Sequence, residues 1–303
     1  MSQPKLVLVG GNGFLGRHLA THFQTLGYQV VSISRTGPGD VRWDARTLGP
    51  WARELEGADL LVNLAGRSVD CRYSEANRQA ILTSRTDSTR VLGAAVAACA
   101  RPPRVWLNSS TATIYPDTRG DAPANVEANS TPGGPFSEKV GRAWEAAFWA
   151  APAPATTRRV ALRTAIVLGA DGGAFPVLAR LARFGLCTPQ GAGQQWISWL
   201  HIIDFCRAVE FLAKADDLSG PVNLCAPYPL RNREFNALLA RALRPLLKLP
   251  QPRWLLEVGA FVLRTETELI LKSRKVYPER LLAAGFRFEY ERCAAAVGEL
   301  IES

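Results

Sequence analysis

The start of the chain alternates a short apolar run with a stretch of apolar residues at helical spacing. Residues 5–9, Lys-Leu-Val-Leu-Val, form a continuous apolar run, which predicts a buried parallel strand. After a glycine-rich turn, apolar side chains recur every three or four positions over residues 14–26. Gly27 follows this stretch, as glycine commonly follows the last turn of a helix. The pattern therefore predicts a strand, a turn and a helix.

The same alternation continues to about residue 167. It predicts further strands at residues 28–34, 59–64, 104–108 and 160–163, and helices at about 74–100 and 136–149. Strands that alternate with helices through short turns specify a parallel sheet with helices on both faces. The sequence therefore predicts an α/β fold with a doubly wound parallel sheet.

The remainder of the chain has a weaker pattern. It contains several helical stretches, a short Trp-rich segment at residues 195–201 and a strand near Val222. We expect a smaller, mostly helical C-terminal portion packed beside the sheet. The chain then divides into residues 1–168, which form most of the sheet, and residues 169–303, a substrate-side portion interleaved with the sheet.

Three glycines join the first predicted strand to the first predicted helix. Gly10, Gly13 and Gly16 have the spacing G-x-x-G-x-x-G. The first permits a tight turn, the second lets the backbone approach a pyrophosphate, and the third lets helix and strand pack closely. The N-terminus of the helix presents free N–H groups and a partial positive charge to phosphates. This context favours a Rossmann-type dinucleotide site over a purely structural Gly-rich turn.

The end of the second predicted strand favours NADP(H) over NAD(H). NAD-specific sites usually place an acidic residue there, whereas this chain has Ser34-Arg35. A guanidinium suits the 2′-phosphate of NADP(H) and can stack on adenine. The alternative is an ordinary solvated arginine. Asp44 could bind the adenine amine or act as a turn aspartate.

Charge and composition narrow the classes of partner. The net charge is +9 and the sequence pI about 9.6, but the arginines are spread along the chain without a nucleic-acid-binding motif. We therefore expect a phosphate-bearing small molecule and no nucleic acid.

No apolar run is long enough for a membrane span, and the first residues do not resemble a signal peptide. Six scattered cysteines form no C-x-x-C pair, so we expect reduced thiols, no metal and a cytoplasmic protein.

Several segments resemble the extended, epimerase-like branch of the short-chain dehydrogenase/reductases. They are the Gly10–Gly16 loop, Asn63-Leu64-Ala65-Gly66 and the segment from Ser109 to Tyr115. A closer resemblance is to atypical epimerase family proteins with a DUF1731-type C-terminal region, here from about residue 250. The residues that carry it are Ser84-Arg85, Thr89-Arg90, Trp144-Glu145, Arg163, Val167-Leu168-Gly169, Gly172-Gly173, the segment from Gly193 to Asp204, Asn223, Ala226-Pro227, Pro278, Arg280-Leu281 and Gly285-Phe286-Arg287-Phe288.

The resemblance implies how the dinucleotide would lie. The pyrophosphate would bind the backbone of Gly13, Phe14 and Leu15, and the adenine ribose would pass over Leu64, Ala65 and Gly66. The nicotinamide would lie near Ser109. Extended members often pair their long helices across a dimer interface, so the resemblance leaves a homodimer open.

The catalytic centre departs from the superfamily's pattern. Typical members use a Tyr, a Lys four residues later, and a Ser or Thr that orients the substrate carbonyl. Thr111 stands at the Ser/Thr position, but Phe136 replaces the Tyr and Val140 the Lys. Phenylalanine cannot exchange a proton. Lys139 comes one residue early, which rotates it by about 100° on a helix.

Two residues are candidate substitutes. Tyr115 lies on the substrate side of the expected cofactor and could exchange a proton, or it could be a structural tyrosine. Lys139 could reach a ribose hydroxyl or a phosphate, or it could be a solvated helix lysine. Two hypotheses follow: an NADP-dependent oxidoreductase or epimerase-like enzyme acting on a small polar substrate, or a non-catalytic NADP(H)-binding sensor or scaffold.

Other polar and aromatic residues have structural interpretations. His201 and Asp204 suggest a pair, but we expect Asp204 to cap a helix over residues 205–213 and His201 to anchor the turn before it. The alternative is that His201 lines the pocket. Trp196 and Trp199 could wall a substrate cavity or fill the core. Glu145 is expected to pair with one of the arginines.

Overall fold

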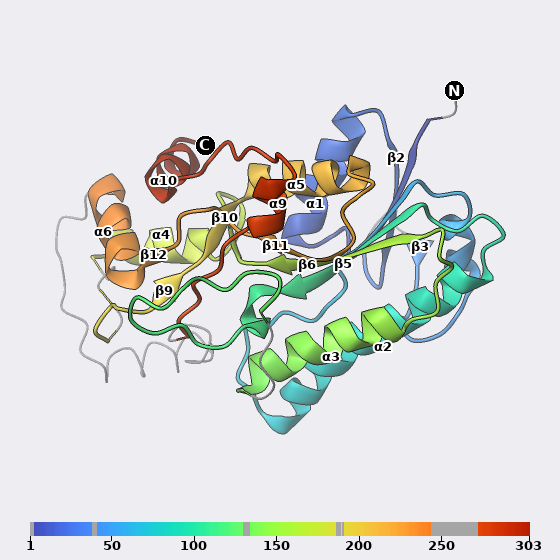
Figure 1. Ribbon diagram of the computed structural model, residues 1–303, viewed down its shortest axis with the longest axis horizontal. Helices are drawn as coiled ribbons and strands as arrows, with labels where there is room; N and C mark the ends of the chain where they lie inside the picture. Colours follow the sequence, from blue (N-terminus) through green and yellow to red (C-terminus); the bar gives the residue numbers. More distant parts are fainter. Residues whose placement is uncertain (1–2, 38–40, 130–133, 186–188, 190, 244–271) are drawn as a thin grey trace.

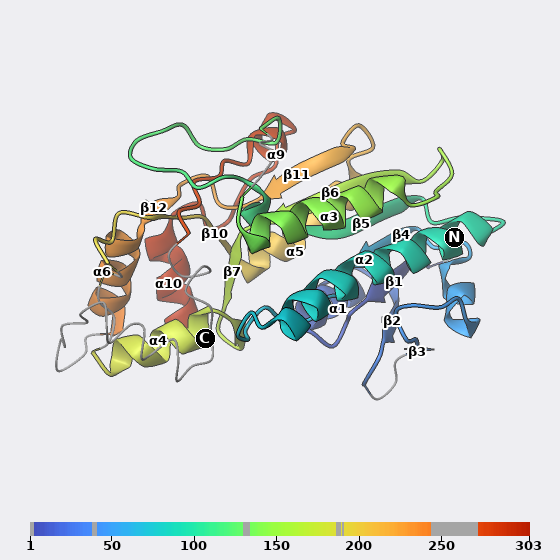
Figure 2. The ribbon, with the colours of Figure 1, turned by 90° about the horizontal axis from the view of Figure 1, so that it is seen from below.

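The main sheet has seven parallel strands. In this computed structural model, which describes residues 3–37, 41–129, 134–185, 189, 191–243 and 272–303, its order is β11-β6-β5-β4-β1-β2-β3 (Figures 1 and 2). The strands are β1 (Lys5–Val9), β2 (Gln29–Ser34), β3 (Val41–Arg42), β4 (Leu60–Asn63), β5 (Val105–Thr111), β6 (Arg158–Thr164) and β11 (Gly220–Leu224). Cys187 and the expected start of the C-terminal region near residue 250 lie outside the described residues. The predicted doubly wound fold is confirmed.

Helices cover both faces of this sheet. One face packs against α1 (Phe14–Thr25) and α5 (Ile202–Lys214), the other against α2 (Glu75–Ala98) and α3 (Phe136–Ala150), which lie side by side (Figures 1 and 2). The run Leu6–Val9 of strand β1 is continuously apolar because both faces of the sheet are covered at this strand. Leu6 and Leu8 enter the core beneath α1 and α5, while the alternate residues Val7 and Val9 enter the core beneath α2 and α3.

The C-terminal portion has its own small core. The C-terminal portion contains the helices α4 (Phe175–Arg183), α6 (Asn232–Leu243), α9 (Glu279–Ala283) and α10 (Cys293–Glu302). Phe175, Trp199, Phe235 and Leu300 pack in this core. Strands β7 (Ile166–Gly169), β8 (Gly172–Gly173), β9 (Trp196–Ile197), β10 (Trp199–His201) and β12 (Leu230–Arg231) form two small sheets. Strands this short have too few residues to show a period of two, so the sequence did not predict them.

The segment after residue 271 returns to the N-terminal portion. The amide of Arg274 donates to the carbonyl of Trp196 at 2.8 Å. Asn125 forms a parallel bridge with Val276: its amide donates to the Lys275 carbonyl, and its carbonyl accepts from the Tyr277 amide. Residues 272–277 therefore act as an added extended segment between the two portions. Among the described helices, none is both long and apolar enough to cross a bilayer.

The expectation for Asp204 is wrong. Helix α5 begins at Ile202, and its N-cap is His201, whose Nδ1 accepts from the Ile203 amide at 3.3 Å. The fully buried Asp204 carboxylate instead accepts from the amides of Glu289 and Tyr290, both at 2.8 Å. The helix starts three residues earlier than expected, so Asp204 lies inside its first turn. The expected anchoring role of His201 is confirmed.

Candidate functional site

The glycine loop has the geometry that its sequence predicts. Gly10 has φ +84°, and a Cβ there would lie 3.1 Å from the carbonyl carbon of Leu64. A Cβ on Gly16 would lie 2.6 Å from the Gly10 carbonyl oxygen, so helix and turn could not pack as closely with a larger residue. Gly13 is the N-cap of α1, which has no side-chain cap and no acidic residue in its first turn. The loop and helix therefore form an anion cradle made of backbone.

Asn12 ties the glycine loop to the end of β2. Its side-chain amide donates to the Ser34 hydroxyl at 3.0 Å and to the carbonyl of Thr36. The loop and the Ser34-Arg35 segment are thereby held together. The sequence analysis did not single out Asn12, because an x position between glycines carries no signal of its own.

A cleft of about 520 Å³, here the Arg35 cleft, opens beside this junction. Its lining includes the predicted residues Gly10, Gly13, Ser34, Arg35, Asp44, Leu64, Ala65 and Gly66, and also Arg46 and Arg67. The three arginines make this end of the site suited to a phosphate. Asp44 accepts from the amides of Arg46 and Thr47 and from the Thr47 hydroxyl, and these hydrogen bonds lower its pKa to about 2. Asp44 is therefore a turn aspartate that also faces the cleft.

A buried network fixes the loop after β4. The Asn63 side chain donates to Asn108 Oδ1 at 2.7 Å, and its own oxygen accepts from the Ala65 amide at 3.0 Å. Thr89 on α2 joins this network, since its hydroxyl accepts from the Asn63 side-chain amide at 3.4 Å and from Trp144 Nε1 at 3.1 Å. These contacts position Leu64, Ala65 and Gly66 under the cleft.

A second cleft of about 470 Å³, the Thr111 cleft, continues past the glycine loop. It is lined by Gly10, Gly13, Phe14, Leu15, Gly16, Leu64, Ser109, Thr111, Arg85, Phe136, Val140 and Trp144, among others. Both clefts share Gly10, Gly13 and Leu64, so they are two halves of one elongated site. The predicted pyrophosphate, ribose and nicotinamide residues therefore lie along a continuous surface.

The wall that usually carries the catalytic pair is apolar in this chain. Phe136 meets Tyr73 edge to face, with ring centroids 5.0 Å apart, and the guanidinium carbon of Arg78 lies 4.9 Å from the Phe136 ring centre. Val140, one turn later, packs with Tyr73 in a small hydrophobic cluster. The wall supplies no acid or base at these two positions.

The three catalytic candidates are not brought together. Thr111 lines the Thr111 cleft, and its hydroxyl lies 3.0 Å from that of Thr113. The Lys139 side chain is exposed, and Lys139 lines none of the described clefts. Tyr115 also lines none of them and is almost fully buried. The geometry thus leaves Thr111 as the candidate that can meet a ligand.

Tyr115 belongs to a buried polar network behind the cleft. Its hydroxyl donates to Asn223 Oδ1 at 2.7 Å and accepts from Arg163 Nη1 at 2.9 Å. Burial raises the pKa of Tyr115 to about 12, against the lowering effect of Arg163. Arg163 also pairs with Glu145, as expected for that carboxylate. Tyr115 is therefore a neutral phenol at neutral pH, held in a structural network.

A third cavity of about 360 Å³, the Trp196 cavity, adjoins the Thr111 cleft. The two share Val69, Thr111, Thr113 and Thr164. Aromatic walls come from Trp196, Trp199 and Phe235, and polar groups from Asn232, Asn236, Lys272 and Arg274. Trp199 is fully buried and also fills the core, so both expected roles of the two tryptophans are present.

Lys272 and Arg274 are site residues that the sequence analysis missed. They occupy alternate positions of the extended segment 272–277 and both line the Trp196 cavity. Lys272 Nζ donates to Glu138 Oε1 and to the Thr113 carbonyl, both at 2.8 Å. Lys272 and Glu138 are 134 positions apart in the sequence, and no local pattern near either residue indicates that they meet.

Family comparisons match nearly the whole chain. The NAD dependent epimerase/dehydratase family matches residues 6–225, and a domain of unknown function, DUF1731, matches residues 251–300. The human epimerase family protein SDR39U1 is 31% identical over 304 residues, covering 98% of this chain and 99% of the relative. The epimerase family protein YfhF of Bacillus subtilis is 28% identical, covering 98% of this chain and 97% of the relative.

Solved structures are similar in fold. The crystal structure of human SDR39U1 (isoform 2) with NADPH has a TM-score of 0.87 at 29% identity, covering 98% of this chain and 99% of that one. A nucleoside-diphosphate sugar epimerase from Corynebacterium glutamicum has a TM-score of 0.79 at 28% identity. It covers 99% of this chain, which spans 58% of that longer protein.

Proposed function

The chain belongs to the NAD dependent epimerase/dehydratase family, and on this basis we propose that it binds NADP(H) across the Arg35 and Thr111 clefts. The observation that carries the proposal is the glycine cradle, where Gly13 opens an uncapped helix N-terminus to a ligand. The human relative, 29% identical in its crystal structure, was crystallised with NADPH. Gly13, Phe14 and Leu15 then bind the pyrophosphate, and Leu64, Ala65 and Gly66 lie against the adenosine ribose.

The Arg35 cleft supports the choice of the 2′-phosphorylated form. Arg35 follows β2, and Arg46 and Arg67 line the same cleft. A planar guanidinium can bind a phosphate through two parallel hydrogen bonds. Asp44 belongs to the same cleft, where its carboxylate can accept from the adenine amine.

We propose an oxidoreductase or isomerase activity on a small polar substrate in the Trp196 cavity. This cavity opens to the Thr111 cleft through shared residues, so a substrate in it would lie beside Ser109 and Thr111. Bound dinucleotide supplies hydride transfer. Thr111 would donate a hydrogen bond to the substrate oxygen, and the polar groups of the cavity would orient the rest of the molecule.

The rival function, a non-catalytic NADP(H)-binding sensor or scaffold, is favoured by Phe136 and Val140. An NADPH-oxidation assay with a library of small carbonyl compounds separates the two, once calorimetry has measured NADPH binding. Turnover that is lost in Thr111→Ala with cofactor affinity retained supports the enzyme. Tight NADPH binding, with neither net oxidation of NADPH nor isomerisation of any compound detected by NMR, supports the sensor. Failure of NADPH to bind at all would contradict both.

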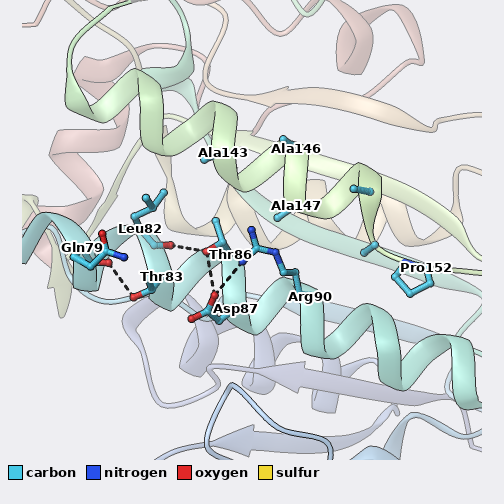
Figure 3. Close-up of a pocket in the computed structure, with 12 residues that line it drawn as sticks. Gln79, Leu82, Thr83, Thr86, Asp87, Arg90, Ala143, Ala146, Ala147 and Pro152 are labelled. Atoms are coloured by element: carbon cyan, nitrogen blue, oxygen red, sulfur yellow. Dashed lines mark hydrogen bonds and ion pairs between the residues drawn. The ribbon is translucent and has the colours of Figure 1, made fainter.

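A homodimer through α2 and α3 is also proposed. The two helices flank a groove lined on the α3 side by small residues, among them Ala143, Ala146 and Ala147 (Figure 3). On the α2 side, Asp87 and Arg90 form an ion pair at 3.1 Å. Small side chains let a second helix pair approach closely, and a two-fold axis would place the same groove on each partner.

A further inference from the structure

Arg85 of α2 lines the Thr111 cleft. Its Nη1 donates to the carbonyls of Arg67 and Ile81, at 3.1 and 3.0 Å. Its guanidinium carbon lies 5.1 Å from the centre of the Trp144 ring. A Cβ on Gly66 would lie 3.3 Å from that same carbon, so the glycine leaves the guanidinium its space. The head group is thus held in place by backbone and an aromatic ring.

Two buried cations near these clefts have acidic partners, whereas Arg85 has none in the part of the chain that the structure describes. Arg163 pairs with Glu145, and Lys272 pairs with Glu138. Among the described residues, no carboxylate lies within ion-pair distance of Arg85. Burial lowers the pKa of its guanidinium to about 10, which reflects the cost of enclosing the charge without an acidic partner. An anionic ligand would offset that cost.

Arg85 lies near the position on α3 where the expected lysine is replaced by Val140. Val140 occupies the place where the resembled superfamily has its lysine, and Trp144, under the Arg85 guanidinium, is one helical turn further on. Arg85, Val140 and Trp144 all line the Thr111 cleft. The positive charge absent at position 140 of α3 is therefore present on the neighbouring helix.

We propose that Arg85 binds the nicotinamide half of the dinucleotide, donating hydrogen bonds to the nicotinamide-side phosphate of the pyrophosphate and to the adjoining ribose. The proposal rests on the proposed binding of NADP(H) and adds a residue from α2 to that site. Arg85 then supplies the positive charge that typical members of the superfamily supply from α3. Nη1 is used by the two carbonyls, so Nε and Nη2 are the groups that would meet the ligand.

Two ligands separate this role from that of Arg35. NADPH spans both clefts, whereas 2′,5′-ADP has the adenosine and 2′-phosphate but no nicotinamide half. Calorimetry of Arg85→Gln should show NADPH binding weakened about ten- to a hundredfold, with 2′,5′-ADP affinity within about twofold of the parent. Arg85→Lys should recover part of the loss because it keeps the charge. Arg101→Gln, an exposed arginine just beyond α2, is the matched control and should change neither affinity.

Each outcome decides between the two proposals. A parent protein that binds neither ligand contradicts the proposed function itself. A parent that binds NADPH while Arg85→Gln binds it equally well, or loses both ligands to the same extent, overturns the role of Arg85 alone. Should Arg85→Gln fail to fold, the ¹⁵Nε resonance of Arg85 in the parent, assigned by its absence in Arg85→Lys, provides the measurement. It must shift with NADPH and not with 2′,5′-ADP; an unmoved resonance overturns the proposal.

Discussion

Arg163 and Glu145 meet in a two-pronged ion pair inside the protein, with Nε–Oε1 and Nη2–Oε2 distances of 2.8 Å. The pair joins β6 to α3 and also holds Ser110, which donates to Glu145 Oε1 at 2.6 Å. It lies directly behind the Thr111 cleft, because Ser110 lines that cleft. A buried charge pair thus supports the back of the Thr111 cleft.

Arg163→Met should destabilise the fold by about 3–5 kcal/mol, because it leaves the Glu145 carboxylate buried without its partner. Denaturant unfolding measures the change. The double variant Arg163→Met/Glu145→Gln should recover part of the loss, since no unpaired charge remains. Arg101→Met, which removes an exposed pair with Glu56, should cost less than about 1 kcal/mol. Equal losses for the buried and exposed pairs would contradict this explanation.

Gly13→Ala and Gly16→Ala should separate binding from folding. A Cβ on Gly13 meets only the Gly10 carbonyl oxygen, at 3.5 Å, so the protein should fold with stability changed by less than about 0.5 kcal/mol. Its methyl group would occupy the approach of the pyrophosphate, and NADPH affinity should fall more than about tenfold. A Cβ on Gly16 lies 2.6 Å from backbone atoms of Gly10 and Gly11, so this variant should lose about 1–3 kcal/mol of stability. Thermal unfolding and calorimetry check both, and a Gly13→Ala protein with parental affinity would argue against the cradle.

Arg35→Asp should abolish or reverse the preference for NADPH over NADH. A carboxylate repels the 2′-phosphate and can accept from the ribose hydroxyls of NADH instead. The loss of one charge-assisted hydrogen bond alone is worth about 1.5–3 kcal/mol, or roughly ten- to a hundredfold in affinity. Titration calorimetry with both coenzymes gives the ratio. Arg119→Asp changes the charge equally at an exposed position and should leave the ratio as it is.

Stability should fall on the acid side because of His201. Burial lowers the pKa of His201 below its ordinary value of 6.5, against the raising effect of Glu299. The unfolded chain therefore takes up the proton first, so the contribution of the neutral imidazole is fully present above about pH 6.5 and is lost as the pH falls below it. Urea unfolding from pH 8 to pH 5, compared with His201→Gln, measures this. The parent should lose stability relative to the variant on acidification; a relative gain would show that the Glu299 contact outweighs burial.

Ala146→Arg should convert the proposed dimer into a monomer. The residue is exposed on α3 and lines the groove between α2 and α3, where an arginine would keep a second copy from approaching. Light scattering after gel filtration gives the mass. Ala284→Arg, exposed just after α9, is the control and should leave the mass unchanged. A parent protein that is monomeric at high concentration would rule out the interface.

The sheet and the glycine cradle could be predicted because their signals are local. Apolar runs, helical spacing and glycines at fixed offsets lie within a few residues of one another, so residues 5–34 already specify the first strand, helix and strand. Arg35 follows β2, whose predicted end at residue 34 is confirmed. Thr111 is the last residue of β5, which runs three residues past its predicted end at 108, and it was singled out by the resemblance to the superfamily's Ser/Thr position.

The rest depends on contacts between distant parts of the chain. Asp204 has the spacing of a helix cap, but the amides that it binds come from residues 289 and 290. Tyr115 lies close in sequence to Thr111, yet a short 3-10 turn directs it to Asn223 and Arg163, behind the cleft. The spacing of apolar and polar residues cannot predict these hydrogen bonds, because each depends on where a later segment of the chain lies in the fold.

The returning segment 272–277 has a consequence for how the gene can be divided. A product truncated after residue 225, where the first family match ends, would leave Asn125 without its two main-chain partners and Glu138 without Lys272. Truncation would thus damage the wall of the cavity as well as remove the C-terminal residues. The two matched regions should therefore be expressed and engineered together, and insertions or fusion joints should lie outside residues 272–277.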